Sequence, residues 1–194
     1  MKTLYKSEQS GRSMVEMLGV LAIIGVLSVG GIAGYSKAMA KFKTSKALDQ
    51  VSTTVANVRT LYSGQPNYSG LNTEIAIKMG AIGAEMLSGQ SPTTAKVAYN
   101  AFNGVVTISA TKVSNRDNGG FELVFSGLSK EACVQMASSD WGSGSGSGLV
   151  SVQAGDVAGS KGETSKGTLP LNLAAAAAGC NQEGDANKVT WVYY

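Results

Sequence analysis

The chain has 194 residues, with 16 Lys or Arg against 13 Asp or Glu and no histidine. A net charge of +3, with lysines that are scattered rather than grouped beside aromatic residues, indicates no specific nucleic-acid partner. Without histidine the usual serine or cysteine nucleophiles lack a base, and two cysteines are too few for a zinc site, so we expect no enzymatic activity, no metal and no cofactor.

The first predicted element is a membrane-spanning helix. No residue from 17 to 36 is charged, and these 20 residues at about 1.5 Å each reach about 30 Å, which is enough to cross the apolar core of a bilayer. Glu16 lies at the start of this segment, and a carboxylate at mid-bilayer costs about 2.5 to 3.5 kcal/mol. Glu16 is therefore expected to have a function or a partner.

The sequence around Glu16 resembles the type IV prepilin signature, because Gly11 precedes Arg12-Ser13-Met14-Val15-Glu16 and the apolar run. The resemblance implies that a prepilin peptidase cuts after Gly11 and that the mature, N-methylated chain begins at Arg12. It also implies that Glu16 pairs with the new amino terminus of a neighbouring subunit. Two features depart from the family: the leader of 11 residues is shorter than in most type IVb pilins, and Arg12 replaces an apolar first residue.

Glycines within the predicted span extend the resemblance to type IVb pilins. Gly25, Gly30 and Gly31 punctuate the helix, and Ala33 stands where type IVa pilins usually carry a kinking proline. In lipid such glycines permit close approach of helices, and in a dry filament core they let a helix unwind locally. A simpler interpretation is that membrane helices tolerate glycine.

Two other interpretations of the amino terminus stay open. A secretory signal peptide would be cleaved after Ala40 and release a soluble domain, but the apolar run exceeds the 7 to 15 residues of a signal core and Glu16 interrupts its start. A plain single-span anchor is the other. Charge does not fix the orientation, because basic residues lie on both sides of the span. They are Lys2, Lys6 and Arg12 before it, and Lys37, Lys41, Lys43 and Lys46 after it.

The helix is predicted to continue beyond the span as an amphipathic segment. An apolar stripe recurs at spacings of three and four, the pattern of a helix packed against another surface. Its members are Leu48, Val51, Val55, Val58 and Tyr62. Ser63-Gly64-Gln65-Pro66 should end the helix, because proline cannot continue it.

A short helix followed by several strands is predicted next. Asn72 caps a short helix within Leu71–Met79. Antiparallel strands follow, joined by turns at Asn103-Gly104 and at Asp117-Asn118-Gly119-Gly120. The strands are Val97–Tyr99, Val105–Ser109 and Phe121–Phe125, with a last one at Val189–Tyr194. A mixed α+β domain is therefore expected.

The region between these strands supplies a second resemblance. Ser129 caps a helix that carries the apolar set Ala132, Cys133, Met136 and Ala137. The string from Leu128 to Gly142 resembles a helix in pilins of conjugative thin pili. Surface loops are expected at 142–148 and 155–167, and an alanine helix at 174–178 that Gly179 stops.

Cys133 and Cys180 are an even count in a chain that resembles an exported protein, which favours one disulfide. The bond would close a loop of about 48 residues and contribute about 4 kcal/mol in the chain-entropy model. Two free, buried thiols are the alternative.

Together these resemblances imply a type IV pilin fold of the α+β class, with a long N-terminal helix on an antiparallel sheet and a disulfide-closed C-terminal region. The expected organisation is a cleaved leader at 1–11, a membrane or filament-core half-helix at 12–36 and a globular domain at 37–194. The expected function is that of a structural subunit of a type IVb pilus.

The expected subunit forms a homopolymer that serves adhesion, aggregation or conjugative mating-pair stabilisation. Its expected partners are other subunits, the prepilin peptidase, the inner-membrane assembly machinery and a host or recipient cell surface. We expect it in the inner membrane as a prepilin and then in an extracellular filament. A type II secretion pseudopilin and a secreted binding domain released after Ala40 remain alternatives.

Overall fold

The computed structural model describes residues 14–142, 147–155 and 169–194. The predicted leader, the cut between Gly11 and Arg12, and most of the two predicted glycine-rich loops lie outside these residues. The described residues form two units, one ending at Lys41 and one covering Phe42–Tyr194. Each is described by itself below, although helix α1 (Met14–Tyr62) contributes to both.

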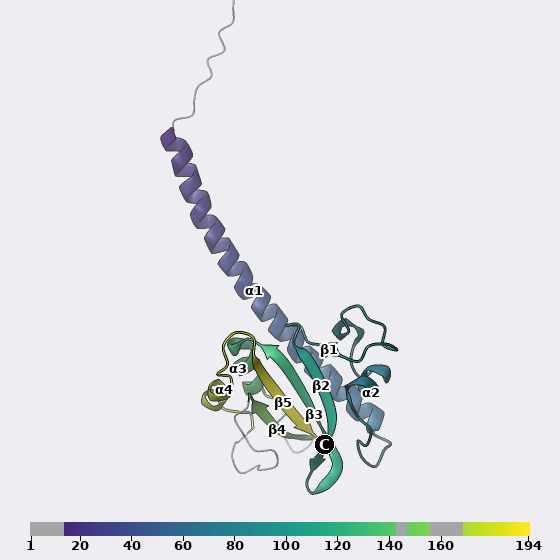
Figure 1. Ribbon diagram of the computed structural model, residues 1–194. Helices are drawn as coiled ribbons and strands as arrows, with labels where there is room; N and C mark the ends of the chain where they lie inside the picture. Colours follow the sequence, from purple (N-terminus) through teal and green to yellow (C-terminus); the bar gives the residue numbers. More distant parts are fainter. Residues whose placement is uncertain (1–13, 143–146, 156–168) are drawn as a thin grey trace, which may run out of the picture. The chain divides into compact units, whose positions relative to one another are not determined.

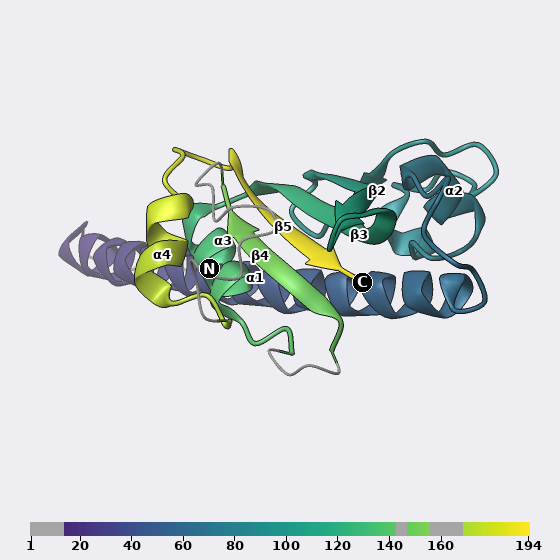
Figure 2. The same cartoon turned by 90° about the horizontal axis from the view of Figure 1, so that it is seen from below.

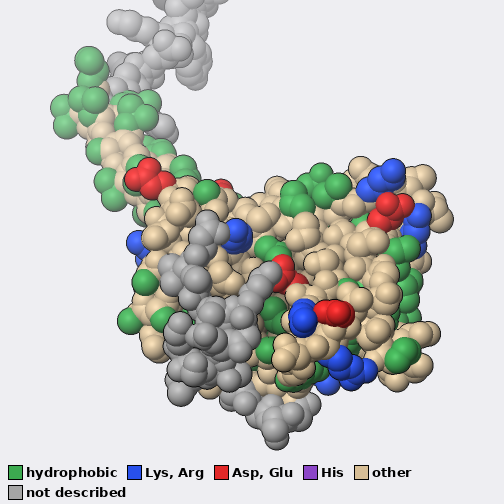
Figure 3. Space-filling view, turned by 60° about the horizontal axis from the view of Figure 1, so that its bottom comes forward, with side chains coloured by type: hydrophobic (Ala, Val, Ile, Leu, Met, Phe, Trp, Pro, Cys, Tyr) green, Lys and Arg blue, Asp and Glu red, His purple; other side chains and the backbone are tan. Residues whose placement is uncertain are grey.

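In the first unit the chain is helical from Met14 onward, and its apolar side chains are exposed. Its most apolar 18-residue window has a mean hydropathy of 2.2, and none of that window is buried. By length and composition this helix can cross a membrane. The space-filling view shows hydrophobic side chains around the exposed helix (Figure 3).

In the second unit the remainder of α1 buries one face. Val51, Val55 and Val58 are buried, and Leu48 and Tyr62 pack against the core from its edge, so the predicted apolar stripe is confirmed. The helix ends at Tyr62, as the following Ser-Gly-Gln-Pro sequence predicts.

A five-stranded antiparallel sheet forms the other layer of this unit (Figure 1). Its strands are β1 (Ala98–Tyr99), β2 (Val105–Val113), β3 (Arg116–Leu128), β4 (Leu149–Ala154) and β5 (Asn187–Tyr193). Their spatial order is β1-β2-β3-β5-β4, so the last strand in sequence lies between β3 and β4. Trp191 on β5 stands opposite Leu123 on one side and Val152 on the other.

Helices α1 and α3 (Lys130–Ser138) cover the same face of the sheet (Figure 2). On the α1 side, ring contacts run from Tyr62 to Tyr68 at 5.2 Å and from Tyr68 to Phe121 at 5.0 Å. Just beyond the end of α3, Trp141 meets Trp191 at 5.1 Å. Phe121 and Trp191 are fully buried, so the core lies between the two helices and the sheet.

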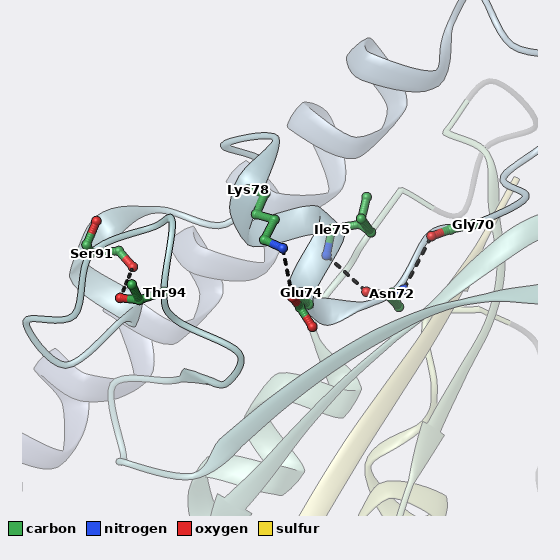
Figure 4. A network of polar contacts seen from close by, with 7 residues as sticks. All are labelled: Gly70, Asn72, Glu74, Ile75, Lys78, Ser91 and Thr94. Atoms are coloured by element: carbon green, nitrogen blue, oxygen red, sulfur yellow. Dashed lines mark hydrogen bonds and ion pairs between the residues drawn. The ribbon is translucent and has the colours of Figure 1, made fainter.

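The short helix α2 (Thr73–Lys78) begins at the predicted cap. The Asn72 side chain accepts a hydrogen bond from the Ile75 amide at 2.9 Å, and Glu74 pairs with Lys78 at 2.8 Å (Figure 4). The adjacent chain covers the outer edge of β2, because Asn72 bridges to Ser109 and the Thr73 hydroxyl accepts from the Ile108 amide at 3.1 Å. A 3₁₀ turn, η1 (Ala84–Met86), follows.

One predicted turn is wrong. Asp117-Asn118-Gly119-Gly120 lies inside β3, and the β2–β3 hairpin turns instead at Ser114 and Asn115, whose φ angles are 50° and 61°. Two positive φ angles in succession match the right-handed twist of the strands they join. Gly120 serves close packing instead, because a Cβ there would collide with the Tyr193 carbonyl oxygen on β5.

The prediction for the β1–β2 connection is correct, since Asn103 has a φ of 64° and the Asn100 amide donates to the Gly104 carbonyl at 2.9 Å. Strand β4 is absent from the predictions. Its six residues stand between two glycine-rich stretches, and their sequence, Leu-Val-Ser-Val-Gln-Ala, is short and only partly apolar.

Candidate assembly site

Glu16 lies in the first turn of α1 and is exposed. A carboxylate in a first turn interacts favourably with the positive end of the helix dipole. Within residues 14–142, 147–155 and 169–194, no Lys or Arg forms an ion pair with Glu16. Gly11 and Arg12 lie outside the described residues, so the cut and the Arg12 amine remain predictions.

The predicted flexibility glycines are all helical. A Cβ added at Gly25, Gly30 or Gly31 meets nothing within 4 Å, so packing within the described chain does not require glycine at these positions. Glycine costs about 1 kcal/mol relative to alanine in a helix interior. The surrounding side chains are large and apolar, for example Val26, exposed to 75%, and Val29, exposed to 71%. This surface is suited to contact with lipid or with another helix.

The disulfide joins Cys133 of α3 to Cys180, the C-cap of helix α4 (Leu173–Gly179). The two Cα atoms are 5.8 Å apart, and both cysteines are fully buried. The predicted pairing is confirmed. The enclosed chain includes β4, and α4 packs closely on that strand, since a Cβ at Gly179 would collide with the Ala154 carbonyl oxygen. The bond therefore ties the C-terminal region to the sheet.

Arg59, in the last turn of α1, connects distant parts of the chain, a role that was not predicted from the sequence. Its guanidinium Nη1 donates to the Ser147 carbonyl oxygen at 2.6 Å. The next residue, Gly148, accepts a hydrogen bond from the Tyr194 amide at 2.8 Å. Arg59 thus connects the end of α1 to the end of the sheet. Its one signal in the sequence is a basic residue near a helix C-terminus, which is too common to single it out.

The Arg59 guanidinium also lies near two tyrosines. Burial raises the pKa of Tyr193 to about 12, while the positive charge of Arg59 acts in the opposite direction. The pKa of Tyr68 is raised for the same reason and opposed by the same charge. Both phenols are therefore neutral at ordinary pH and belong to the ring cluster of the core.

Buried amide side chains hold the connections between elements and were also missed. Gln50 of α1 accepts from the Ala101 amide at 3.0 Å, next to β1. Asn187, at the start of β5, donates to the Leu128 carbonyl at 3.2 Å. In the described residues no group of three or more His, Cys, Asp or Glu side chains is placed to hold a metal ion. Gln50 and Asn187 thus hold neighbouring elements together.

The long apolar helix, the antiparallel sheet and the disulfide-closed C-terminal region define a type IV pilin. The chain belongs to the PilS N-terminal family, whose model matches residues 41–194. It is 28% identical over 193 residues to the major structural subunits of bundle-forming pilus from Escherichia coli O111:H- and from E. coli O127:H6 (strain E2348/69 / EPEC). Each match covers 98% of this chain and 97% of the relative.

The fold is also similar to that of a type IV b pilin from Salmonella typhi, with a TM-score of 0.56 and 20% identity. That match covers 77% of this chain and 98% of the other. The predicted membership of the type IVb pilins is confirmed by the family match together with these relatives.

Proposed function

We propose that this type IVb pilin is the structural subunit of a surface filament and polymerises through α1. The observation that carries the proposal is the exposed apolar surface of the first unit, which has no covering within the described chain. Such a surface needs a bilayer or other helices around it. The curated relatives are major structural subunits of a pilus, which supports a structural rather than a catalytic role and an extracellular filament.

In the proposed assembly route, residues 12–36 anchor the prepilin in the inner membrane and a prepilin peptidase removes residues 1–11. The amine of Arg12, methylated after cleavage, then pairs with Glu16 of an adjoining subunit as the inner-membrane assembly machinery adds it to the filament. Docking replaces two poorly solvated charges by one ion pair. Removing one partner of a buried pair typically costs about 3 to 5 kcal/mol, because the other charge stays buried alone.

The glycines of α1 support the same proposal. Gly25, Gly30 and Gly31 lower helix stability without a steric reason inside the described chain. Between subunits, the missing side chains allow neighbouring helices to approach closely, and they let the helix unwind where the packing requires it. The proposed filament serves adhesion, aggregation or mating-pair stabilisation on a host or recipient cell.

Replacement of Glu16 by Leu tests the proposal. The variant should insert in the membrane at least as well as the wild type, because its span is more apolar, and its disulfide should form as before. Filaments should be absent in electron micrographs. Glu16→Gln provides the matched polar control, and it should fail for the same lack of charge. Abundant normal filaments from Glu16→Leu would contradict the proposed role of Glu16.

A further inference from the structure

Four lysines follow the apolar segment of α1 within ten residues. They are Lys37, Lys41, Lys43 and Lys46. After Glu16 the next acidic residue in the chain is Asp49, so no carboxylate stands among these lysines or between them and the apolar segment. Their four charges exceed the net charge of the whole chain, which is +3.

These lysines are free to bind something else. Lys37, Lys41 and Lys46 are exposed and Lys43 is half-buried. In the described part of the chain, Lys78 pairs with Glu74 and Lys112 pairs with Asp117, and neither of these ion pairs includes a lysine of this group. On the face of the globular unit seen in Figure 3, by contrast, basic and acidic side chains are few and intermixed.

Their place along the helix brings them to a membrane surface. The uncharged segment ends at Ser36, so Lys37 lies at its boundary. Two exposed aromatic side chains lie in the same stretch: Tyr35 is 68% exposed and Phe42 is 62% exposed. Here, contrary to the scattered distribution expected from the sequence, the lysines are grouped beside aromatic residues. Aromatic rings and long lysine side chains are both typical of the bilayer interface, where an apolar stem meets hydrocarbon and a polar end reaches water.

We propose that Lys37, Lys41, Lys43 and Lys46 form a lysine collar that binds the phosphate groups of anionic phospholipids. The lipids belong to the leaflet from which the globular unit emerges, and this inference rests on the membrane stage of the proposed function. A lysine ammonium is a compact charge with three donors, which suits mobile headgroups better than one fixed ligand. Lys37 directly follows the uncharged segment and the other three lysines come next along the same helix, so binding needs no separate encounter.

The collar has a consequence for assembly. A subunit that leaves the bilayer for the filament exchanges its lipid phosphates for water or for carboxylates of other subunits. Anionic lipid therefore retains the unassembled subunit, and a membrane with less anionic lipid releases it more readily. The effect weakens with salt, because ions screen charges at the surface.

The test measures lipid selectivity around the full-length chain. The protein is reconstituted in vesicles of phosphatidylcholine and phosphatidylglycerol, and electron paramagnetic resonance of spin-labelled lipids gives the relative association constant of each lipid. Phosphatidylglycerol should be enriched severalfold at low salt, less at high salt, and inorganic phosphate should not displace it. The K37Q/K41Q/K43Q/K46Q variant should lose this enrichment, because it removes the charges that attract the anionic headgroups.

The control removes the same charge elsewhere. The K78Q/K96Q/K112Q/K130Q variant should keep the wild-type selectivity, because its substituted lysines lie outside α1. Integration of the wild type without any preference for phosphatidylglycerol would overturn the collar and leave the proposed function standing. Unchanged selectivity in the collar variant, with loss of filaments in cells, would also overturn it and assign these lysines to another subunit. A wild-type chain that does not integrate at all would overturn the membrane stage itself.

Discussion

Arg59 and Ser147 are 88 residues apart in the sequence, yet the guanidinium of one donates to the carbonyl oxygen of the other at 2.6 Å. This bond joins the last turn of α1 to the segment that leads into β4. The end of the long helix is thereby fixed to the disulfide-closed region by a charged hydrogen bond as well as by the apolar core.

Replacement of Arg59 by Ala should lower the free energy of unfolding by about 1.5 to 3 kcal/mol, the range for a hydrogen bond to a charged group. The measurement is denaturant unfolding of the full chain in detergent. Arg116→Ala is the matched control, because Arg116 also donates to a carbonyl, that of Pro66, but on an exposed surface. An equal loss of unfolding free energy in the two variants would show that the partial burial of Arg59 does not strengthen its hydrogen bond.

Stability should fall in strongly alkaline solution. Burial raises the pKa of Tyr193 from an ordinary value of 10.0 to about 12. Between these values the unfolded chain releases the phenol proton and the folded chain keeps it, so unfolding becomes easier as pH rises, and the stabilisation is fully present below pH 10. In Tyr193→Phe the free energy of unfolding should fall less steeply with pH, and near pH 12 the difference from the wild type should reach up to about 2 kcal/mol. Tyr194→Phe, at the exposed neighbour, is the control.

Processing should depend on the size of residue 11. Gly11→Val should leave the leader attached and give no filaments, whereas Gly11→Ala should be processed in part. Mass spectrometry of the exported protein measures this directly. A wild-type chain that begins at Lys41 would instead show cleavage after Ala40 by a signal peptidase.

The disulfide should be inaccessible and stabilising. Both cysteines are fully buried, so thiol reagents should react only after reduction and unfolding. Cys133→Ser should cost about 2 to 5 kcal/mol, the usual loss for a native disulfide of a small exported domain. Alkylation of both sulfurs in native, unreduced protein would contradict the bond.

Gly120 should not accept a side chain. The Cβ of Gly120→Ala would collide with the Tyr193 carbonyl oxygen, and the strands must separate to admit it. The expected loss is about 1 to 3 kcal/mol, typical of overpacking. Gly64→Ala is the control, because a Cβ at Gly64 meets nothing within 4 Å. If Gly120→Ala were as stable as the wild type, the close packing of Gly120 against β5 would be contradicted, and a turn at residues 117–120 would again be the better interpretation.

Features that a local sequence pattern or a residue count indicates could be predicted from the sequence. The stripe through Val51, Val55 and Val58 specifies a helix and its buried face, because the spacing itself carries the information. The Cys133–Cys180 bond was expected from the cysteine count and the exported character of the chain.

Other parts depend on residues that are distant in sequence. Two glycines at 119 and 120 are typical of a turn, and nothing local reveals that β5 passes beside Gly120. Arg59 and Gln50 act on backbone groups that the sequence does not bring near them. Strand β4 is short, and it is a strand because β5 pairs with it. These features follow from tertiary contacts, which a single sequence does not display.

The position of β5 determines when the sheet can be completed during synthesis and folding of the chain. Asn187–Tyr193 is the last strand in sequence, yet it is the strand that both β3 and β4 require as a neighbour. Contacts between distant segments form late, because the intervening chain must first be synthesised and closed into a loop. In the proposed membrane stage, the apolar helix is therefore available for insertion before the sheet of the globular unit is complete. A chain that stops before Asn187 lacks the strand between β3 and β4, so the sheet of the globular unit becomes complete only once β5 has been synthesised.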